Sequence, residues 1–379
     1  MRTYRPTAII ATALFVAAAA VVAFWPVGFV ARAPGPAVDL LGATEGQPVL
    51  RVAGPATYPT TGGILFTTVR QTSADRSLSL VPALLDHLLP EREVLPRADV
   101  YRTDDTADGV AQQRADGLRQ AQEAAVVAAL RQLEQDADPP GRAPLVKESV
   151  EVGSIVSGGP ADGRLQIGDV LVSLGDKPVK TVAQVAALIR QDSAVGTNLP
   201  VTVFRAGQGN VGLAIELGKS RLNLPTLGVT WRQRYDYTAY LRSVGVSLDP
   251  GAGDDANGLA LALALYDRLS PRNLAGERVI AAVGSLTLSD ATAEAPGQAD
   301  PSQIATVSAV PAIRQHVVSA ADHGASLVLL PRGNCADVEG LTTSARLVPV
   351  STFREAVDTL ARLAQGEDLS SVPGCGPIS

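Results

Sequence analysis

The chain has 379 residues, of which 46% are hydrophobic and 4% aromatic, and its formal net charge is −6 at pH 7. This length allows two or three domains, whose cores must be built mainly from alanine, valine and leucine. The negative charge and the lack of a basic block argue against nucleic acid as a partner, and they give no support to acidic substrates.

Residues 1–33 have the pattern of a membrane-targeting segment. Arg2 and Arg5 precede an uncharged stretch from Thr7 to Ala31, which is long enough to span a bilayer and longer than the core of a signal peptide. Because the positive residues come first, we expect a single-pass anchor in the cell membrane with the bulk of the chain extracytoplasmic. Cleavage after Ala31-Arg32-Ala33 is the alternative. Pro34-Gly35-Pro36 is expected to be a stiff exit linker.

The next hundred residues contain three predicted elements. Residues 48–70 alternate short apolar runs with turns, which favours a β-hairpin whose second strand begins at Ile64. Val81 to Leu89 is predicted to be a short helix. Asp116 to Leu133 has an alanine-rich apolar stripe with charged residues opposite it, which is typical of an amphipathic helix. Acidic residues and Pro139-Pro140-Gly141 end that helix in a linker or domain junction.

Residues 147–217 have the order of short strands and tight turns. The turns are Gly158-Gly159-Pro160-Ala161, Leu165-Gln166-Ile167-Gly168-Asp169 and Leu174-Gly175-Asp176, with branched apolar residues between them. A helix from Val182 to Gln191 and a strand from Leu199 to Arg205 complete the order. These residues resemble a bacterial PDZ domain, which we place at residues 147–218.

PDZ domains take an extended peptide as an added strand beside a helix. The resemblance therefore implies a groove that receives protein C-termini or unfolded segments. Its expected residues are Val150 and Val152 on the strand and Val185, Leu188 and Ile189 on the helix. The same residues are equally consistent with the core faces of a strand and a helix. No glycine-rich carboxylate-binding loop is identified; Arg142 and Lys147 are either carboxylate partners or solvated surface charges.

The part after residue 219 alternates strands and helices. The predicted strands are 244–248, 279–283, 327–330 and 347–350, and the predicted helices are 256–269, 311–323 and 352–364. Residues 249–253 are expected to form a turn, after which Asp254 or Asp255 caps the next helix. Residues 289–302 are rich in alanine, proline and aspartate and are expected to form an inserted loop.

Two segments of this part carry a second resemblance. They are Gly253-Asp254-Asp255-Ala256-Asn257-Gly258-Leu259 and Val310-Pro311-Ala312-Ile313-Arg314-Gln315-His316. They resemble the catalytic segments of a Lon-type serine protease domain, which carry a nucleophilic serine and a general-base lysine. The serine position is Ala256 here and the lysine position is Arg314. The resemblance implies an α/β domain of the ribosomal S5 domain 2-like type, at residues 219–365.

The two replacements remove the expected chemistry. Alanine has no heteroatom that attacks a carbonyl group, and arginine stays protonated, so it cannot accept a proton from a hydroxyl group. We therefore expect no catalytic residues and a pseudo-protease. A working peptidase that uses Ser247, Ser285 or Ser308 with His316 is the alternative.

The only cysteines are Cys335 and Cys375. An oxidising compartment favours one disulfide that joins the tail, residues 366–379, to the last domain, while a free pair is the alternative. The three histidines and the lack of a C-x-x-C pair argue against a metal site. No Gly-x-x-x-x-Gly-Lys-Ser/Thr loop exists, so we expect neither ATP nor any other cofactor.

The whole arrangement is α+β and resembles membrane-anchored bacterial proteins that join a PDZ domain to a Lon-type peptidase domain. Further matching residues are Tyr58-Pro59-Thr60-Thr61-Gly62, Leu265-Tyr266-Asp267-Arg268-Leu269-Ser270-Pro271 and Leu330-Pro331-Arg332-Gly333-Asn334-Cys335. Residues 34–146 would then supply the first half of the Lon-like domain, with the PDZ domain inserted after it. The expected function is a membrane-anchored peptide-binding scaffold; the alternatives are an active Lon-type endopeptidase and a subunit of a homo- or hetero-oligomeric ring.

Overall fold

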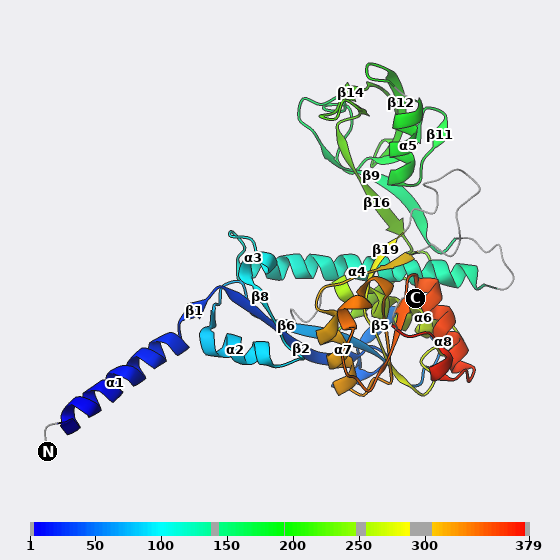
Figure 1. Cartoon of the computed structure of the whole chain (residues 1–379). Coiled ribbons are helices and arrows are strands. Elements are labelled where there is room, and N and C mark those ends of the chain that lie inside the picture. Colours follow the sequence, from blue (N-terminus) through cyan, green and yellow to red (C-terminus); the bar gives the residue numbers. More distant parts are fainter. Residues whose placement is uncertain (1–3, 138–143, 193, 248–254, 289–304, 376–379) are drawn as a thin grey trace.

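The computed structural model describes residues 4–137, 144–192, 194–247, 255–288 and 305–375. The fold is mixed α+β, with an N-terminal helix, a large body and a smaller domain that projects from the body on two strands (Figure 1). The predicted turn at 249–253, the capping residue Asp254 and the loop at 289–302 lie outside the described residues.

The body is built on a six-stranded sheet in the order β22-β21-β18-β6-β2-β8. Its strands are β2 (Phe29–Asp39), β6 (Gly63–Gln71), β8 (Glu93–Pro96), β18 (Val279–Ala282), β21 (Leu327–Pro331) and β22 (Arg346–Val350). β6, β18, β21 and β22 are parallel, and β2 runs antiparallel to β6 and β8. The strands predicted near residues 279, 327 and 347 are therefore confirmed.

Helices cover both faces of this sheet. The alternation of side chains along β6 sends Ile64 and Phe66 to the core shared with α4, α6 and α8, and Leu65 to the core shared with α7. The helices are α4 (Ala107–Gln135), α6 (Gly258–Leu269), α7 (Ile313–Asp322) and α8 (Phe353–Ala364). Each confirms a predicted helix, and α4 extends well beyond the predicted range of 116–133.

The first half of the body differs from the prediction in its pairing. β5 (Leu50–Ala53) and β6 do not form a hairpin: β5 pairs with β17 (Ser243–Val246), and β6 lies between β2 and β18. Long-range pairing therefore overrides the local turn signal at residues 58–63. These pairings, together with the packing of α4 on α6, bring residues 48–135 into contact with the chain after residue 220.

The predicted exit linker at residues 34–36 is wrong, because these residues lie inside β2. The pairing of β2 with β6 shifts register between Pro34 and Ala37, which accommodates two prolines that cannot donate backbone hydrogen bonds. A Cβ atom on Gly35 would lie 2.3 Å from the Thr68 hydroxyl oxygen, so only glycine allows this close approach. The Thr68 hydroxyl donates to the carbonyl oxygen of Pro36 at 2.7 Å.

The N-terminal helix α1 covers Tyr4–Ala23. Across the described residues, none of the helices is both long and apolar enough to cross a membrane. After α1, the short strand β1 (Pro26–Val27) pairs with β7 (Leu78–Ser79), which leads directly into α2 (Leu80–Leu88). The predicted short helix at 81–89 is thus confirmed, and it lies beside the end of α1 (Figure 1).

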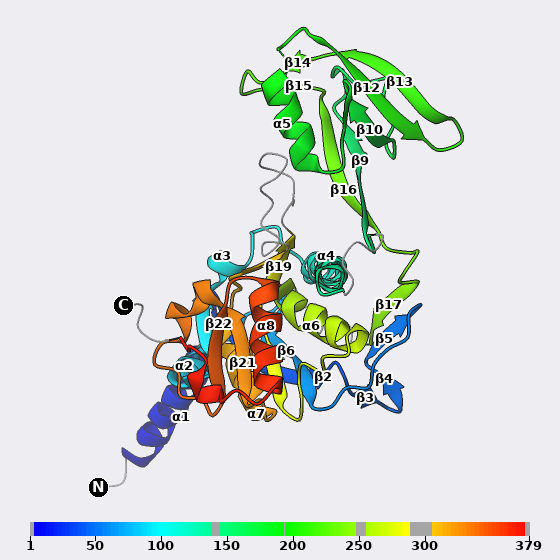
Figure 2. The same ribbon diagram turned by 90° about the vertical axis from the view of Figure 1, so that its right-hand side faces the viewer.

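The projecting domain is a second sheet in the order β13-β12-β10-β9-β16, flanked by α5 (Val182–Asp192) (Figure 2). Its strands are β9 (Lys147–Ile155), β10 (Val170–Leu174), β11 (Lys177–Pro178, beside β10), β12 (Asn198–Arg205), β13 (Gly209–Glu216) and β16 (Val229–Asp236). β16 lies beyond the predicted domain end at 218, because the chain returns through β14 (Gly218–Lys219) and β15 (Pro225–Thr226) and rejoins the same sheet.

β9 and β16 also connect the two domains. They pair from Val229 opposite Ile155 to Asp236 opposite Lys147, and the ribbon they form leads to the body (Figure 2). On α4, Arg131 forms an ion pair with Glu148 at the base of this ribbon. The guanidinium carbon of Arg131 also lies 5.7 Å from the centre of the Tyr235 ring. These contacts attach the ribbon to the longest helix of the body.

The described residues also contain several short elements. They are β3 (Ala43–Thr44), β4 (Gln47–Pro48), α3 (Arg97–Val100), β19 (Ser285–Leu288) and β20 (Ala305–Ser308), and the 3-10 turns η1 (Asp255–Asn257), η3 (Arg332–Asn334), η4 (Ala336–Val338) and η5 (Leu369–Ser371). The residue that precedes α6 is Asn257 in η1, so the helix start differs by two residues from the prediction. The elements that surround the predicted catalytic positions are therefore η1, α7 and the turns after β21.

Candidate functional site: an open strand edge and the two predicted catalytic positions

The strand predicted to receive a peptide is closed on both sides. β9 pairs with β10 along one edge and with β16 along the other, and Val150 and Val152 are fully buried in the core of this domain. Among the described residues, both edges of β9 are occupied at Val150 and Val152, so the predicted place of the added peptide strand is wrong. The cause is β16, which the sequence analysis did not include in this domain.

The available edge belongs to β16. It is the last strand of the sheet, and in the described part of the chain no strand pairs with its outer edge. Along β16, half-buried and exposed residues alternate: Val229 and Trp231 pack against the domain core, while Thr230 and Arg232 face solvent. This arrangement leaves backbone donors and acceptors beside an apolar surface.

Helix α5 lies next to β16. The Gln233 side chain accepts a hydrogen bond from the N–H of Val182 at 3.0 Å and donates to the carbonyl oxygen of Lys180 at 2.9 Å. These two bonds fix the start of α5 beside the middle of the strand. Of the predicted helix residues, Val185 and Ile189 are buried in the core, and Leu188 is half-buried at its edge. Leu188 therefore remains the best placed of the three to contact a ligand.

The strand β16 begins at a tightly held turn. Gly228 has a positive φ of 70°, and its carbonyl oxygen accepts a hydrogen bond from Val156 at 2.8 Å. The carbonyl oxygen of Leu227 accepts a hydrogen bond from Ala161, in the Gly-Pro-Ala turn, at 3.1 Å. The sequence contained a signal for this turn and strand, since Leu227-Gly228 precedes a period-2 pattern from Val229 to Tyr235.

The predicted carboxylate partners are not at this turn. Lys147 is opposite Asp236, at the other end of β16 from Gly228. Arg142 lies outside the described residues. Neither residue therefore supports carboxylate binding at the start of β16.

Asp169 of the Leu-x-x-Gly-Asp turn has a structural role. Its carboxylate accepts hydrogen bonds from Nε and Nη2 of Arg205 at 2.8 and 2.7 Å, and from the N–H of Gln166 at 2.8 Å. Burial opposes ionisation of this carboxyl group, but the bonds from Arg205 and Gln166 outweigh it and lower the pKa of Asp169. The ion pair joins β12 to the turn before β10.

In the body, the two predicted catalytic positions are near a common apolar core. Ala256, in η1, is buried in a cluster with Val310 and Ile313, the residues that lead into α7. The carbonyl oxygen of Ala256 accepts a hydrogen bond from Gly284 at 2.6 Å. A methyl group therefore fills the place that the resemblance assigns to a nucleophile.

Arg314 has a packing role on α7. Its Nη1 atom donates to the carbonyl oxygens of Asp337 at 3.1 Å and Glu339 at 3.2 Å. Asp337 lies in η4 and Glu339 directly follows it, so the guanidinium group closes the turn after the cystine. Arg314 thus holds a loop and cannot act as a base.

The alternative catalytic residues have other contacts. His316 is buried, and its Nδ1 atom lies 2.8 Å from the Thr67 hydroxyl oxygen on β6. The Ser247 hydroxyl accepts from Arg51 at 2.7 Å. Ser308 lies 3.1 Å from the Thr287 hydroxyl and is opposite Ser285 in the β19–β20 pair. These contacts give no support to a Ser/His pair.

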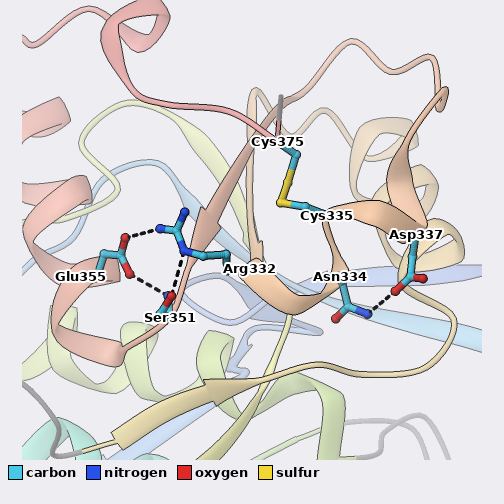
Figure 3. The surroundings of a disulfide bond; sticks show 7 residues. All are labelled: Arg332, Asn334, Cys335, Asp337, Ser351, Glu355 and Cys375. Carbon is cyan, nitrogen blue, oxygen red and sulfur yellow. Dashed lines mark hydrogen bonds and ion pairs between the residues drawn. A yellow bond between two sulfur atoms is a disulfide. The ribbon is translucent and has the colours of Figure 1, made fainter. Parts of the chain in front are cut away.

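The predicted disulfide Cys335–Cys375 is confirmed (Figure 3). It joins the tail to the turn after β21, and the N–H of Cys375 donates to the carbonyl oxygen of Leu347 on β22 at 3.3 Å. Beside it, Asn334 exchanges two hydrogen bonds with the backbone of Val310, at 2.9 and 3.0 Å, and donates to Asp337 at 2.7 Å. The cystine and Asn334 therefore fix the approach to α7.

The cystine is also beside a cavity of about 500 Å³, which it lines together with residues of β22 and η4. Nearby, Arg332 donates to the Ser351 hydroxyl at 2.9 Å and to Glu355 at 2.8 Å (Figure 3). In the part of the chain that the structure describes, no group of histidine, cysteine and acidic residues is placed to hold a metal ion.

Comparisons with known proteins identify the projecting domain. A family model described as a PDZ domain matches residues 151–203. No curated protein matches the chain. The chain therefore contains a PDZ domain, which spans β9 to β12 in the matched part.

Solved structures similar to the chain cover the same region. The PDZ domain of the SdrC-like protein from Listeria monocytogenes is 23% identical and covers 22% of this chain and 85% of its own, with a TM-score of 0.20. The corresponding domain from Listeria innocua is 22% identical and covers 22% and 93%, with a TM-score of 0.21. A solution structure from Geobacillus thermodenitrificans is 30% identical and covers 22% and 94%, with a TM-score of 0.20.

Proposed function

We propose that this protein is an extracytoplasmic, membrane-anchored scaffold whose PDZ domain binds extended protein C-termini or unfolded segments along β16. The observation that carries the proposal is the outer edge of β16, which lies beside α5 with no strand paired to it among the described residues. An extended peptide placed there extends the sheet by one strand and gains main-chain hydrogen bonds.

The side chains beside this edge set the chemistry of the ligand. Val229 and Trp231 on β16 and Leu188 on α5 are half-buried and apolar. A ligand with apolar side chains at alternate positions buries them against this surface, since successive side chains of a strand face opposite sides. The turn at Gly228 marks the end of the strand where a terminal carboxylate is expected.

We infer that the body is a catalytically degenerate Lon-type domain. The inference rests on the residue matches around Ala256 and Arg314. Ala256 lies in η1, directly before α6, and Arg314 lies in the first turn of α7. The buried methyl group of Ala256 and the carbonyl contacts of Arg314 are consistent with lost catalysis. Such a domain can still hold a bound chain, because backbone donors do not depend on a nucleophile.

The membrane placement belongs to the same proposal. Every described residue of α1 from Ile9 to Val22 is exposed to solvent, including its isoleucine, leucine, phenylalanine and valine side chains. A helix that is apolar on all sides is stable when its surroundings are apolar. The cystine supports an oxidising compartment for the body. We therefore propose that α1, rather than the whole predicted stretch to Ala31, inserts into the membrane, and that the body lies outside the cytoplasm.

Peptide capture tests the binding proposal. The full chain in detergent micelles is probed with an array of peptides that have free or amidated C-termini. Leu188→Lys should weaken binding by about tenfold or more, since a half-buried leucine contact contributes about 1.5 kcal/mol. Ile167→Lys, at an exposed position of the same domain, should leave binding unchanged. Equal binding by both variants contradicts the proposed surface, and equal binding of amidated peptides points to internal segments.

A proteolysis assay tests the inference that the body is catalytically inactive. The full chain should not cleave fluorescent casein above the buffer control. Cleavage that Ser247→Ala abolishes would show a working peptidase and overturn the inference of a degenerate centre.

A further inference from the structure

The helix α2 carries an exposed apolar face. Val81, Leu84, Leu85 and Leu88 are spaced at i, i+3, i+4 and i+7 and lie on one side of the helix. All four are exposed, and Leu88 is 76% exposed. The one acidic residue of α2, Asp86, is paired with Arg92 and has only 13% of its side chain exposed. The exposed side of the helix is therefore mainly leucine and valine.

This face is physically continuous with α1. The carbonyl oxygen of Trp25 accepts a hydrogen bond from the N–H of Leu80, the first residue of α2, at 3.1 Å. Pro26 and Val27 pair with Ser79 and Leu78, so two short strands fix the end of α1 to the start of α2. Whatever covers the end of α1 must therefore also meet α2.

Aromatic side chains mark the junction. Phe24, Trp25 and Phe29 are all exposed, and Trp25 is 61% exposed. Tryptophan has an apolar ring and one N–H donor, and it is favoured where an apolar phase meets water. The junction thus has the composition of a membrane interface.

We propose that the apolar face of α2 lies in the headgroup region of a lipid bilayer, beside the point where α1 leaves it. This proposal rests on the membrane placement of α1 proposed above. A bilayer fits better than a second copy of the chain, because α1 is exposed and apolar on all sides and one flat protein surface covers only one side of a helix. Helices with one apolar face and a paired or polar opposite face lie in the plane of the interface.

The consequence is a fixed orientation of the body. One anchor alone allows a domain to rotate about it, whereas α1 and α2 together give two points of attachment. β2, the strand that follows the junction, belongs to the central sheet, so the sheet is held directly by this attachment.

Site-specific fluorescence tests the proposal. Both native cysteines are bonded to each other, so a single added cysteine is labelled selectively with an environment-sensitive dye. Three variants of the full chain are compared in phosphatidylethanolamine–phosphatidylglycerol vesicles: Leu88→Cys on α2, Phe15→Cys on α1 and Leu222→Cys in the PDZ domain, where the native leucine is 80% exposed. One set of vesicles contains lipids with a nitroxide near the headgroup, and a second set contains lipids with a nitroxide deep in the acyl chain.

We expect a blue-shifted emission and quenching by the headgroup nitroxide at position 88, quenching by the acyl-chain nitroxide at position 15, and neither effect at position 222. Replacing Leu84 and Leu85 with serine should reduce the quenching at 88 severalfold and leave that at 15 unchanged. Quenching at 15 without quenching at 88 overturns the role of α2 and leaves the membrane placement intact. No quenching at either site overturns both. A blue shift at 88 without quenching, which grows with the protein-to-lipid ratio, assigns the face to a second copy and also overturns the proposal.

Discussion

The PDZ domain and the body each bury an aspartate, and they hold it in opposite ways. Asp169 in the PDZ domain is matched by the guanidinium group of Arg205 and by a backbone N–H. Asp267 on α6 is fully buried and accepts a hydrogen bond from the N–H of Leu274, while its second oxygen has no hydrogen-bond partner among the described residues. The PDZ domain therefore pairs its buried carboxylate with a guanidinium group, whereas one carboxylate oxygen of Asp267 in the body has no hydrogen-bond partner among the described residues.

The two pKa shifts follow from this difference. The bonds from Arg205 and Gln166 overcome the effect of burial and lower the pKa of Asp169. Burial dominates at Asp267 and raises its pKa to about 6, against the smaller effects of Leu274 and Arg268. Burial alone therefore does not set the pKa of a buried acid, because the hydrogen-bond partners of the carboxylate decide the direction of the shift.

The largest expected effect is the loss of the compensated pair. Asp169→Ala leaves the Arg205 guanidinium, whose side chain is 13% exposed, without its partner. We expect the PDZ domain to lose about 3–5 kcal/mol of stability, because the change removes both charge-assisted hydrogen bonds of the ion pair and leaves Arg205 only the carbonyl oxygen of Arg164. Hydrogen exchange of β10 and β12 in the full chain should accelerate while that of β18 and β21 stays unchanged.

A matched control separates charge from burial. Asp176→Ala removes an exposed aspartate from the same domain and should change the exchange rates little. If the two variants behave alike, the Asp169–Arg205 pair does not stabilise the domain. Because the folded pKa of Asp169 is lowered, its contribution is present above the unfolded pKa of about 4 and is lost as the pH falls.

The body has a covalent stabiliser that the PDZ domain lacks. The disulfide links residues 40 positions apart. Replacing Cys335 and Cys375 with serine should lower the stability of the body by about 4 kcal/mol, because the unfolded chain regains the entropy of that loop. Denaturant unfolding followed by exchange of β21 and β22 measures the loss, and exchange in β12 should not respond.

Reduction of the native chain provides the control for this change. A reducing agent should reproduce the effect of the double serine variant and should have no effect on that variant. A native chain that resists denaturant equally with and without the reductant contradicts the stabilising role of the cystine.

Much of this architecture was predictable from the sequence, and the errors have a common cause. The helix predicted at 116–133 and the strands predicted at 279–283 and 327–330 have strong local periodicity, and α4, β18 and β21 confirm them. The failures are the hairpin at 48–70, the linker at 34–36 and the peptide edge on β9. Each depends on pairing between distant residues, which local patterns do not specify.

The site shows the same limit. Val150 and Val152 have the composition of a binding strand, but the later return of β16 decides that they are core residues. The sequence alone shows that Ala256 and Arg314 cannot supply a nucleophile or a base, because this concerns side-chain chemistry alone. The contacts that Arg314 makes with the turn at 337–339 were not readable, since they depend on the tertiary fold.

The uncompensated aspartate should give the body the opposite pH response. An acid with a raised folded pKa holds its proton in the folded state where the unfolded chain has lost it, so stability falls as the pH rises from about 4 to about 6. With a pKa of about 6, the stability of the native body relative to Asp267→Asn should fall by about 3 kcal/mol between pH 4 and pH 8.

Asparagine is a suitable replacement because its side-chain oxygen can still accept from Leu274 and its amide does not ionise. The measurement is denaturant unfolding of both chains across this pH range, followed by exchange in the body. A stability difference that is constant from pH 4 to pH 8 contradicts a raised pKa. A difference of the opposite sign would mean that an unseen partner compensates the charge as Arg205 does for Asp169.

The smallest expected effect concerns Arg314, the position that the proposed function assigns to a lost base. Arg314→Met keeps the length of the side chain but removes the two hydrogen bonds to Asp337 and Glu339. Because the site is partly open to water, which can replace these bonds, we expect a loss of only about 1 kcal/mol. Hydrogen exchange of residues 336–341 should accelerate, whereas Arg232→Met, at an exposed position on β16, should change nothing in the body.

This measurement distinguishes a structural role of Arg314 from a functional one. A residue kept for catalysis commonly costs stability, so its replacement is neutral or stabilising. A residue recruited to hold a turn has the reverse effect, and its loss loosens that turn locally. Faster exchange at 336–341 after Arg314→Met therefore assigns the position to structure, while unchanged or slower exchange would return it to the list of functional candidates.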